Sequence, residues 1–299
     1  NWFSPKQFAF MSGLMMTVGM LGAVGGQAPL VAFMHACGWR YAMMMLGIIG
    51  LVLALLFWIV VRDRAPSHKK EKHIVPLEIS LWESIKQILR MRQSWALSVY
   101  SGFAFAPVMV FGGLWGVPFL KESYTLSQNM AAQITSMIFI GFAVGAPLLG
   151  WLSDWIGKRK PVLFWSTLIA LISISLVVYV PGFSQAFVSF LLFLFGFMIS
   201  GFLLSFTMIR EIHLPVLAAT AVGFMNAFDA FFGIFADPLA GRILDARWEG
   251  RLLEGARIYS VEAYKIAFLT LPLYLIIALV VIFWLRETYY KPSPPSSLP

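Results

Sequence analysis

Charged residues are scarce in this sequence. They make up 12% of the 299 residues, against about 25% in an average soluble domain, whereas 60% of the residues are hydrophobic. The mean hydropathy of +0.80 is higher than a soluble chain of this length could bury. The composition therefore excludes a soluble enzyme, a nucleic-acid-binding module and a disordered chain, and it predicts a polytopic membrane protein.

Residues that hold metals or carry out covalent chemistry are also few. Cys37 is the only cysteine, which excludes an internal disulfide and a cysteine-based metal cluster. The four histidines fall in expected loops or at helix ends, and no two stand at ligand spacing on a helix. The sequence has neither a G-x-S-G string nor a P-loop. We therefore expect no metal site, no cofactor and no nucleic-acid partner, and neither an intramembrane enzyme nor an ATP-driven pump is supported.

Long apolar runs dominate the chain instead. A helix needs about 20 mostly apolar residues to cross the hydrocarbon core of a bilayer, and none of the runs shows the sustained alternation of a barrel strand. The sequence predicts an all-α polytopic membrane protein with eight transmembrane helices. Their approximate ranges are 8–35, 40–61, 96–120, 129–152, 161–181, 185–209, 216–241 and 264–285.

The longest connection, residues 62–95, begins with a charged run and continues with apolar residues at helical spacing. That pattern predicts an amphipathic helix over 77–92, lying on the membrane surface; a short packed linker helix is the alternative. Its apolar stripe consists of Leu77, Leu81, Ile85, Ile88 and Leu89, with Lys86, Arg90 and Arg92 off the stripe. The tail after Tyr290 is rich in proline and serine and is predicted to be disordered.

The distribution of lysine and arginine predicts the orientation. If the N-terminus is cytoplasmic, fifteen of these cations fall on the cytoplasmic side and seven on the other. Cytoplasmic loops collect Lys and Arg. We therefore expect both termini to be cytoplasmic.

The most specific string in the chain runs from Gly150 to Lys160, at the cytoplasmic end of the fourth segment. Gly150 would let two helices approach closely. Asp154 would cap or face a helix N-terminus, whose partial positive charge favours an anion. Gly157 would permit a tight turn. Three consecutive cations, Lys158, Arg159 and Lys160, would hold the loop on the cytoplasmic side.

This string resembles the G-x-L-x-D-x-x-G-[RK]-[RK]-[RK] loop signature of the major facilitator superfamily, in the copy between family helices 8 and 9. It departs from the pattern at Trp155. Two further stretches are similar to the family: Trp2-Phe3-Ser4-Pro5 with the later Gly38-Trp39-Arg40, and Glu211-x-x-x-Pro215 followed by Ala219 to Asn226. The resemblance implies that Asp154 faces the start of the first segment, around residues 4–8.

The resemblance also implies a domain organisation. Residues 1–61 would be the last two helices of a first bundle, and 62–95 the central cytoplasmic loop. Residues 96–285 would form a complete six-helix second bundle, and 286–299 a cytoplasmic tail. The chain would then correspond to family helices 5 to 12, with four helices missing before it.

By the same resemblance, the protein would be a secondary transporter that moves a small solute by alternating access around a midplane site. A coupling ion such as the proton and the surrounding lipid would be its other partners, and the bacterial inner membrane its location. A non-transporting sensor or truncated relative with the same fold is the alternative. Gly13, Gly22 and Gly26 partly match a pattern of proton-coupled antiporters, but Gln27 replaces the expected proline, so symport, antiport and uniport stay open.

The seventh segment carries the strongest candidates for substrate or ion coupling. At about 100° per residue, Asn226, Asp229 and Asp237 share one face. The opposite face carries Phe224, Phe228, Phe231 and Phe235. Asp229 stands near mid-depth, where a carboxylate costs roughly 3 kcal/mol on insertion scales and is a functional candidate by default. A structural aspartate bonded to neighbouring hydroxyls is the alternative. Asp237 would be a gate or interface residue.

Three further residues are candidates for the transport path. Gln27 is polar inside the first segment and would face the cavity. Gln133, near the outer end of the fourth segment, would line an entry path. Trp115, near the outer end of the third, would either line that path or belong to the aromatic belt at the membrane interface, and the belt is the favoured interpretation.

Overall fold

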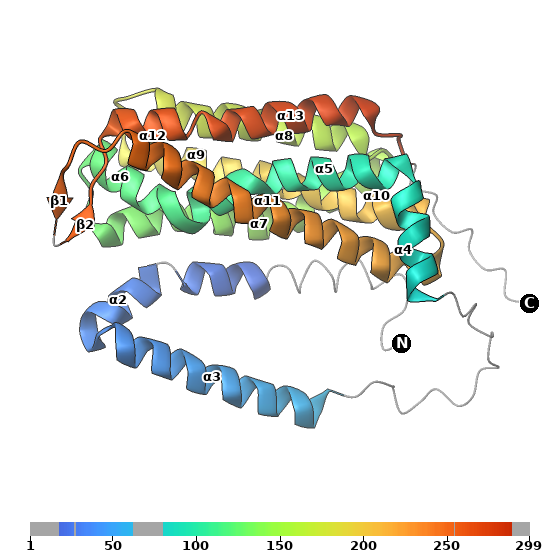
Figure 1. The fold of residues 1–299 in the computed structure, drawn as a ribbon, viewed down its shortest axis with the longest axis horizontal. Coiled ribbons are helices and arrows are strands. Elements are labelled where there is room, and N and C mark those ends of the chain that lie inside the picture. Colours follow the sequence, from blue (N-terminus) through green and yellow to red (C-terminus); the bar gives the residue numbers. More distant parts are fainter. Residues whose placement is uncertain (1–17, 27, 62–79, 254, 289–299) are drawn as a thin grey trace, which may run out of the picture.

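A computed structural model describes residues 18–26, 28–61, 80–253 and 255–288 (Figure 1). Residues 18–25 are helical. The elements that follow are α2 (Ala28–Cys37), α3 (Trp39–Val60), α4 (Leu81–Arg90), α5 (Arg92–Pro107), η1 (Val108–Trp115), α6 (Gly116–Tyr124), α7 (Gln128–Ile156), α8 (Lys160–Tyr179), α9 (Gln185–Ile199), η2 (Ser200–Leu203), α10 (Leu204–Ile212), η3 (Pro215–Leu217), α11 (Ala218–Ala246), β1 (Leu252–Leu253), β2 (Ala256–Arg257), α12 (Val261–Ala267) and α13 (Thr270–Trp284).

The described residues contain eight helical stretches long and apolar enough to cross a membrane. This confirms the predicted all-α polytopic membrane fold. We call the end of the bundle that carries residues 150–160 the motif end, and the end that carries β1 and β2 the hairpin end. The strands β1 and β2 follow α11 and pair with each other over two residues each.

Several predicted helix boundaries were wrong because they followed the apolar residues alone. The seventh helix runs on to Ala246, so Arg242 lies within it and not in a loop. The last span starts at Val261, before Lys265. Polar residues continue these helices beyond their apolar stretch, since a backbone that is already helical gains one hydrogen bond for each residue added.

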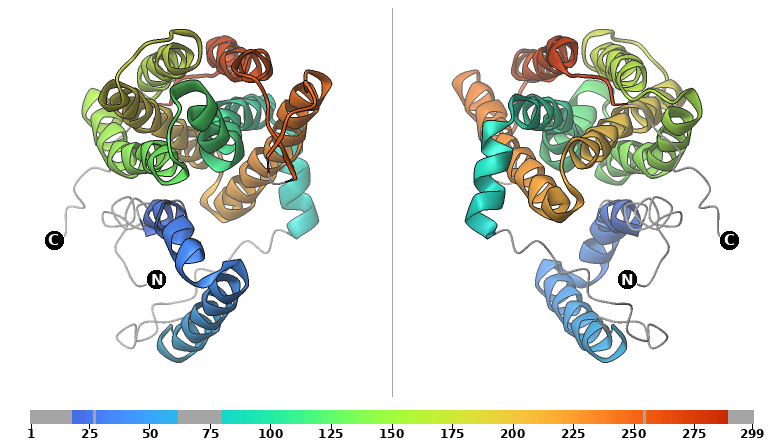
Figure 2. Two further views of the ribbon diagram at one scale, coloured as in Figure 1. Left: turned by 90° about the vertical axis from the view of Figure 1, so that its left-hand side faces the viewer. Right: turned by 90° about the vertical axis from the view of Figure 1, so that its right-hand side faces the viewer.

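Helices α5 to α13 pack side by side in one bundle, which Figure 1 shows lengthwise and Figure 2 from both ends. Glycines set the close contact between α7 and α9. A Cβ on Gly141 would collide with the Phe193 carbonyl, and one on Gly196 with the Ile138 carbonyl. Small residues of this kind let the backbones of transmembrane helices touch.

The first helix of this bundle changes its winding half-way. Within the span Arg92–Tyr124, α5 ends at Pro107 and the next eight residues, η1, form a π-helix. A proline inside a helix removes one backbone donor and crowds the preceding turn, and π-helical turns are rare and frequent at functional sites. Met109 of η1 lines the cavity described below.

Helix α3 lies apart from this bundle in both views of Figure 2, whereas α2 is in contact with α7; both helices are blue. Ala42 is the single buried residue of α3, and Trp58 is 86% exposed. An apolar helix with an exposed surface fits a membrane or another part of a transmembrane protein. The predicted division of the chain at 62–95 stays a prediction, because residues 62–79 lie outside the described part.

The amphipathic helix predicted over 77–92 is present as α4, which spans only Leu81–Arg90. The residues of its expected apolar stripe differ in burial. Ile88 is buried at 1% exposure, whereas Leu81 is 68% exposed. Met91 has extended backbone angles and separates α4 from α5. Helix α4 therefore combines the two interpretations: one face packs on the bundle and the other is open.

Candidate functional site

A cavity of about 770 Å³ lies along one face of α11. Its wall consists of Met20, Phe105, Met109, Phe142, Phe202, Leu203, Phe206, Asn226, Asp229, Ala230, Gly233, Ile234, Asp237 and Pro238. The predicted polar face of the seventh segment therefore lines a hollow in the protein. The polar residues are on α11, and α5, η1, α7, η2 and α10 contribute an apolar, largely aromatic wall.

Asp229 is the most enclosed polar group of the cavity. Its Oδ1 atom is buried and has no hydrogen-bond partner among the described residues. Ser101 of α5 is its neighbour, and the Oγ atom of this fully buried serine is likewise without a partner of good geometry. Buried polar groups are nearly always paired. Asp229 and Ser101 are therefore exceptions to this rule within the cavity wall and next to it.

Asn226 and Asp237 flank Asp229 along the same wall. Asn226 and Asp237 are eleven positions apart, which corresponds to about 16 Å of helix, so the polar groups follow the cavity over half a membrane core. Oδ1 of Asp237 is also buried without a partner among the described residues. Its charge lies near Tyr274 of α13.

The opposite face of α11 is aromatic, as the sequence predicted. Phe224 and Phe228 each meet Trp95 of α5 edge-on, with ring centroids 5.5 Å apart. Phe231 and Phe235 are more than half exposed. The phenylalanines of α11 thus face away from the cavity, and its carboxylates Asp229 and Asp237 face into it.

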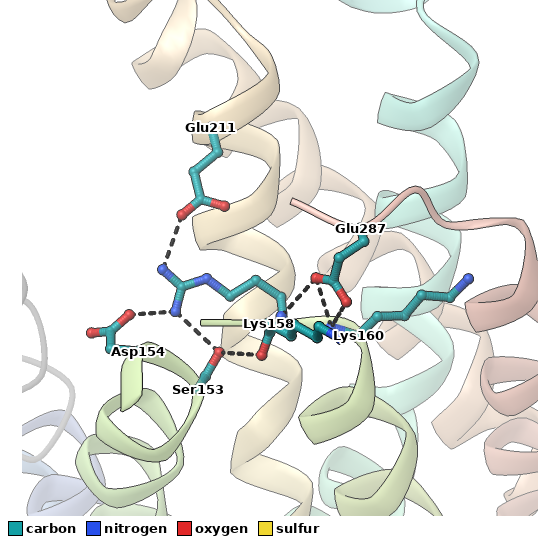
Figure 3. Close-up of polar contacts among 7 residues, drawn as sticks. Ser153, Asp154, Lys158, Lys160, Glu211 and Glu287 are labelled. Atoms are coloured by element: carbon teal, nitrogen blue, oxygen red, sulfur yellow. Dashed lines mark hydrogen bonds and ion pairs between the residues drawn. The ribbon is translucent and has the colours of Figure 1, made fainter. Parts of the chain in front are cut away.

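At the motif end, Arg159 is hydrogen-bonded to Ser153, Asp154 and Glu211, which are labelled in Figure 3. It is 3% exposed, and its guanidinium donates to Asp154 at 2.5 Å and to Glu211 of α10 at 3.0 Å. It also donates to the Ser153 hydroxyl. Burial alone would lower the pKa of Arg159, but the hydrogen bonds and charges of Glu211 and Asp154 raise it above its usual value.

Glu287, just beyond α13, joins the same network from another side. Its carboxylate accepts hydrogen bonds from the backbone N–H groups of Arg159, at 2.7 Å, and Lys160, at 3.2 Å. It therefore caps the N-terminus of α8, where unpaired N–H groups and the helix dipole favour an anion. Sequence reasoning missed this role. The available signal was an acidic residue directly after the last apolar run.

Within the predicted motif, the glycines differ in role. Gly157 has a φ of 71°, in the left-handed region, and closes α7 with the expected tight turn. The close helix approach predicted at Gly150 was wrong, because a Cβ there would meet nothing within 4 Å. Asp154 pairs with Arg159. Its predicted contact with residues 4–8 lies outside the described residues and stays a prediction.

The other predicted path residues that the structure describes are not brought to the cavity. Gln133 is exposed on α7 and is not part of the cavity wall. Gln27 lies outside the described residues. Trp115 is not part of the cavity wall; its ring packs against Tyr259 and its Nε1 atom is buried, and the belt position favoured for it stays a prediction. Trp115 therefore fills space at the hairpin end, where Gly241 leaves room for it.

A second polar contact that sequence reasoning missed lies between α5 and the end of α10. The Oγ atom of Ser94 is 2.8 Å from Nε2 of His213, and both residues are buried. Burial lowers the pKa of His213, which favours the neutral ring. No sequence pattern pointed to this pair, because its members are 119 positions apart.

The sequence model of the Major Facilitator Superfamily matches residues 1–236 and, in a second overlapping match, residues 102–299. The chain belongs to the major facilitator superfamily. This confirms the resemblance carried by residues 150–160.

Two curated members of the superfamily are similar to parts of the chain. The hexuronate transporter of Bacillus subtilis strain 168 is 29% identical over 170 residues, which is 55% of this chain and 40% of that protein. The probable L-galactonate transporter of Escherichia coli K12 is 23% identical over 173 residues, which is 53% of this chain and 37% of that protein. The chain thus spans about two fifths of the length of these relatives.

Solved superfamily structures share the fold. A bacterial homologue of the human lysosomal transporter Spinster, inward-facing and unoccupied, superposes with a TM-score of 0.66 at 19% identity, covering 95% of this chain and 72% of that one. The occupied form of the same homologue superposes with a TM-score of 0.63, and the match covers 70% of that chain. The arrangement of helices described above is therefore that of a major facilitator protein, a multi-pass protein of the membrane.

Proposed function

We propose that this chain is part of a secondary transporter, corresponding to family helices 5 to 12, that moves a small solute by alternating access and couples it to protons at Asp229. Membership of a transporter superfamily supports the first part. The coupling is carried by one observation: Asp229 lines the cavity, and its Oδ1 atom is buried and has no partner among the described residues.

A carboxylate at this position favours proton coupling for a physical reason. Desolvation penalises a charged carboxylate in an apolar wall, and no cation of the described cavity wall offsets that penalty. A proton neutralises the group. In this account Asp229 takes up a proton from one side of the membrane and releases it to the other, and its charge state sets which conformation of the transporter is stable.

For the substrate, we propose a small hydroxylated organic acid. The two named relatives, a hexuronate and a probable L-galactonate transporter, support this class. Asn226 and Asp237 offer amide and carboxylate groups that can bind hydroxyls. No lysine or arginine belongs to the described cavity wall, so a substrate carboxylate would be bound by groups elsewhere in the transporter.

The remaining predicted switch residues would act at the motif end. Arg159 joins the ends of α7 and α10 through Asp154 and Glu211, and Glu287 adds the end of α13. We propose that this network keeps the motif end of the bundle together while the two halves of the transporter rock, with the motif end facing the cytoplasm of a bacterial cell. Gly157 gives the turn that brings Arg159 into place.

The test is transport by the complete protein that contains this sequence, purified and reconstituted in liposomes. Hexuronates and L-galactonate would be supplied with and without an imposed pH gradient. We expect the gradient to drive uphill uptake, and Asp229→Asn to abolish the uphill component and its pH dependence while exchange of substrate is retained.

The matched control is Asp245→Asn. Asp245 is on the same helix, but it accepts hydrogen bonds from Arg257 and Tyr259 at the hairpin end, outside the cavity. It should leave uphill uptake intact. Gradient-driven uptake that is unchanged in Asp229→Asn would show that Asp229 is structural, and no flux of any kind would favour a sensor with this fold.

A further inference from the structure

Buried hydroxyl groups lie in a row on α5 between the motif end and Asp229. Ser94, Ser98 and Ser101 follow one another at intervals of four and three residues, so they share one face of the helix. All three are 0% exposed. Phe105, one turn further along that face, is part of the cavity wall. The face of α5 that carries the three serines therefore continues into the cavity wall.

Two of these hydroxyls are unsatisfied. The Oγ atoms of Ser98 and Ser101 are buried and have no hydrogen-bond partner among the described residues. Most buried serines of the bundle, such as Ser173 of α8, satisfy the hydroxyl by donating to a carbonyl of their own helix. A fully buried hydroxyl without a partner costs about 1–3 kcal/mol, unless water or a proton-carrying group reaches it.

Each end of the row meets a group that can hold a proton. At the motif end, Ser94 is hydrogen-bonded to the His213 ring. At the cavity end, Ser101 is the neighbour of the Asp229 carboxylate. Along the axis, the steps from Ser94 to Ser98 and on to Ser101 are about 6 Å and about 4.5 Å, distances that one bridging water spans.

We propose that Ser94, Ser98 and Ser101, with bridging water, form a proton path between Asp229 in the cavity and His213 at the motif end. This inference rests on the proposed proton coupling and adds the route and the side of release. Protonated Asp229 gives its proton to the adjoining hydroxyl or water. Each oxygen along the row accepts one proton and passes on one proton. The His213 ring accepts the last and returns it to bulk water, and no electrons are transferred.

The charged groups around the path lie at its ends. Arg92 begins α5, and Arg210 and Glu211 precede His213 on α10, where Glu211 is paired with Arg159. At the cavity end, Asp237 is on the same helix as Asp229. Between the ends, α11 faces α5 with aromatic rings, of which Phe232 lies against Gly102. A proton leaving Asp229 therefore has the hydroxyl row as its polar route on this side.

The experiment compares Ser98→Ala with Ser173→Ala in the complete transporter in liposomes. Both variants remove one buried hydroxyl, and only the first lies on the path. We expect Ser98→Ala to slow gradient-driven uptake by about a hundredfold and to leave substrate exchange, which needs no net proton release, close to the native rate. Ser173→Ala should leave both rates unchanged. Unfolding temperatures in detergent establish that the two variants are equally folded.

Each result decides between the claims. If Ser98→Ala leaves driven uptake unchanged, or slows exchange as much as driven uptake, the path is overturned. If Asp229→Asn abolishes coupling while Ser98→Ala has no effect, the path fails and the proposed function stands. If Asp229→Asn itself has no effect on driven uptake, the proposed function fails, and the path fails with it.

Discussion

Environment separates the acidic residues of α11 into two kinds. Asp229 and Asp237 each have a buried oxygen without a partner among the described residues, whereas Asp245 accepts from Arg257 and Tyr259, both at 2.7 Å. The paired carboxylate stabilises the hairpin end. The two unpaired ones reduce stability, which is a cost that functional sites commonly carry.

Arg159 should be the most important residue of the loop for stability. Arg159→Met removes the cation and leaves Asp154 and Glu211 facing each other without it. Because both carboxylates are partly exposed, we expect a loss of about 1–3 kcal/mol, seen as a lower unfolding temperature in detergent. Lys158→Met, which removes an exposed cation from the same turn, is the control. Equal unfolding temperatures for the two variants would contradict the role of the network.

His213 should make stability dependent on pH. Burial lowers its pKa in the folded protein below the ordinary value of 6.5, so the unfolded chain binds the proton more tightly. The stabilising contribution is therefore complete above pH 6.5 and is lost as the pH falls below it. We expect the unfolding temperature to drop between pH 7.5 and 5.5, and His213→Gln to reduce that drop. A drop of the same size in the variant would contradict this assignment.

The helix contacts depend on particular glycines that composition cannot distinguish. Gly150 and Gly196 both lie inside apolar helices, but a Cβ on Gly150 meets nothing within 4 Å and one on Gly196 collides with the Ile138 carbonyl. The neighbouring helix decides whether a glycine is needed for close packing, and the sequence of one helix does not show which helix lies beside it. For this reason the sequence predicted the close approach at the wrong glycine.

Substitution by alanine tests this difference. Gly196→Ala should destabilise the bundle by about 1–3 kcal/mol because α7 and α9 must move apart. Gly150→Ala should be neutral or slightly stabilising, since alanine favours the helix. Unfolding temperatures of the two variants in detergent provide the measurement. A neutral Gly196→Ala would contradict the packing of α7 on α9.

Helix existence was predictable for a simple reason, and helix ends were not. A run of about 20 apolar residues has few alternatives to a membrane helix, so all eight spans were found. The ends depend on local hydrogen bonds. Glu287 caps α8 from 127 or more positions away, and the break at Met91 separates α4 from α5. Long-range partners of this kind leave no periodic pattern in the sequence.

At the scale of the whole molecule, the cavity along α11 combines a polar face with an apolar wall. The polar face of α11 was predictable from periodicity, because one face collects Asn226, Asp229 and Asp237. The apolar wall opposite was not, because its residues come from elements far apart in the chain. The hydroxyl row of α5 was missed too, since serines at helical spacing are common and only burial makes these three unusual.

Proton movement accompanying the substrate is the most direct test of the central claim, that Asp229 couples transport to protons. The complete transporter would be placed in liposomes without an imposed gradient, and a pH-sensitive dye would follow the lumen while substrate flows downhill. We predict a change in luminal pH for the native protein and none for Asp229→Asn, which still exchanges substrate. A pH change of native size in Asp229→Asn would contradict the account.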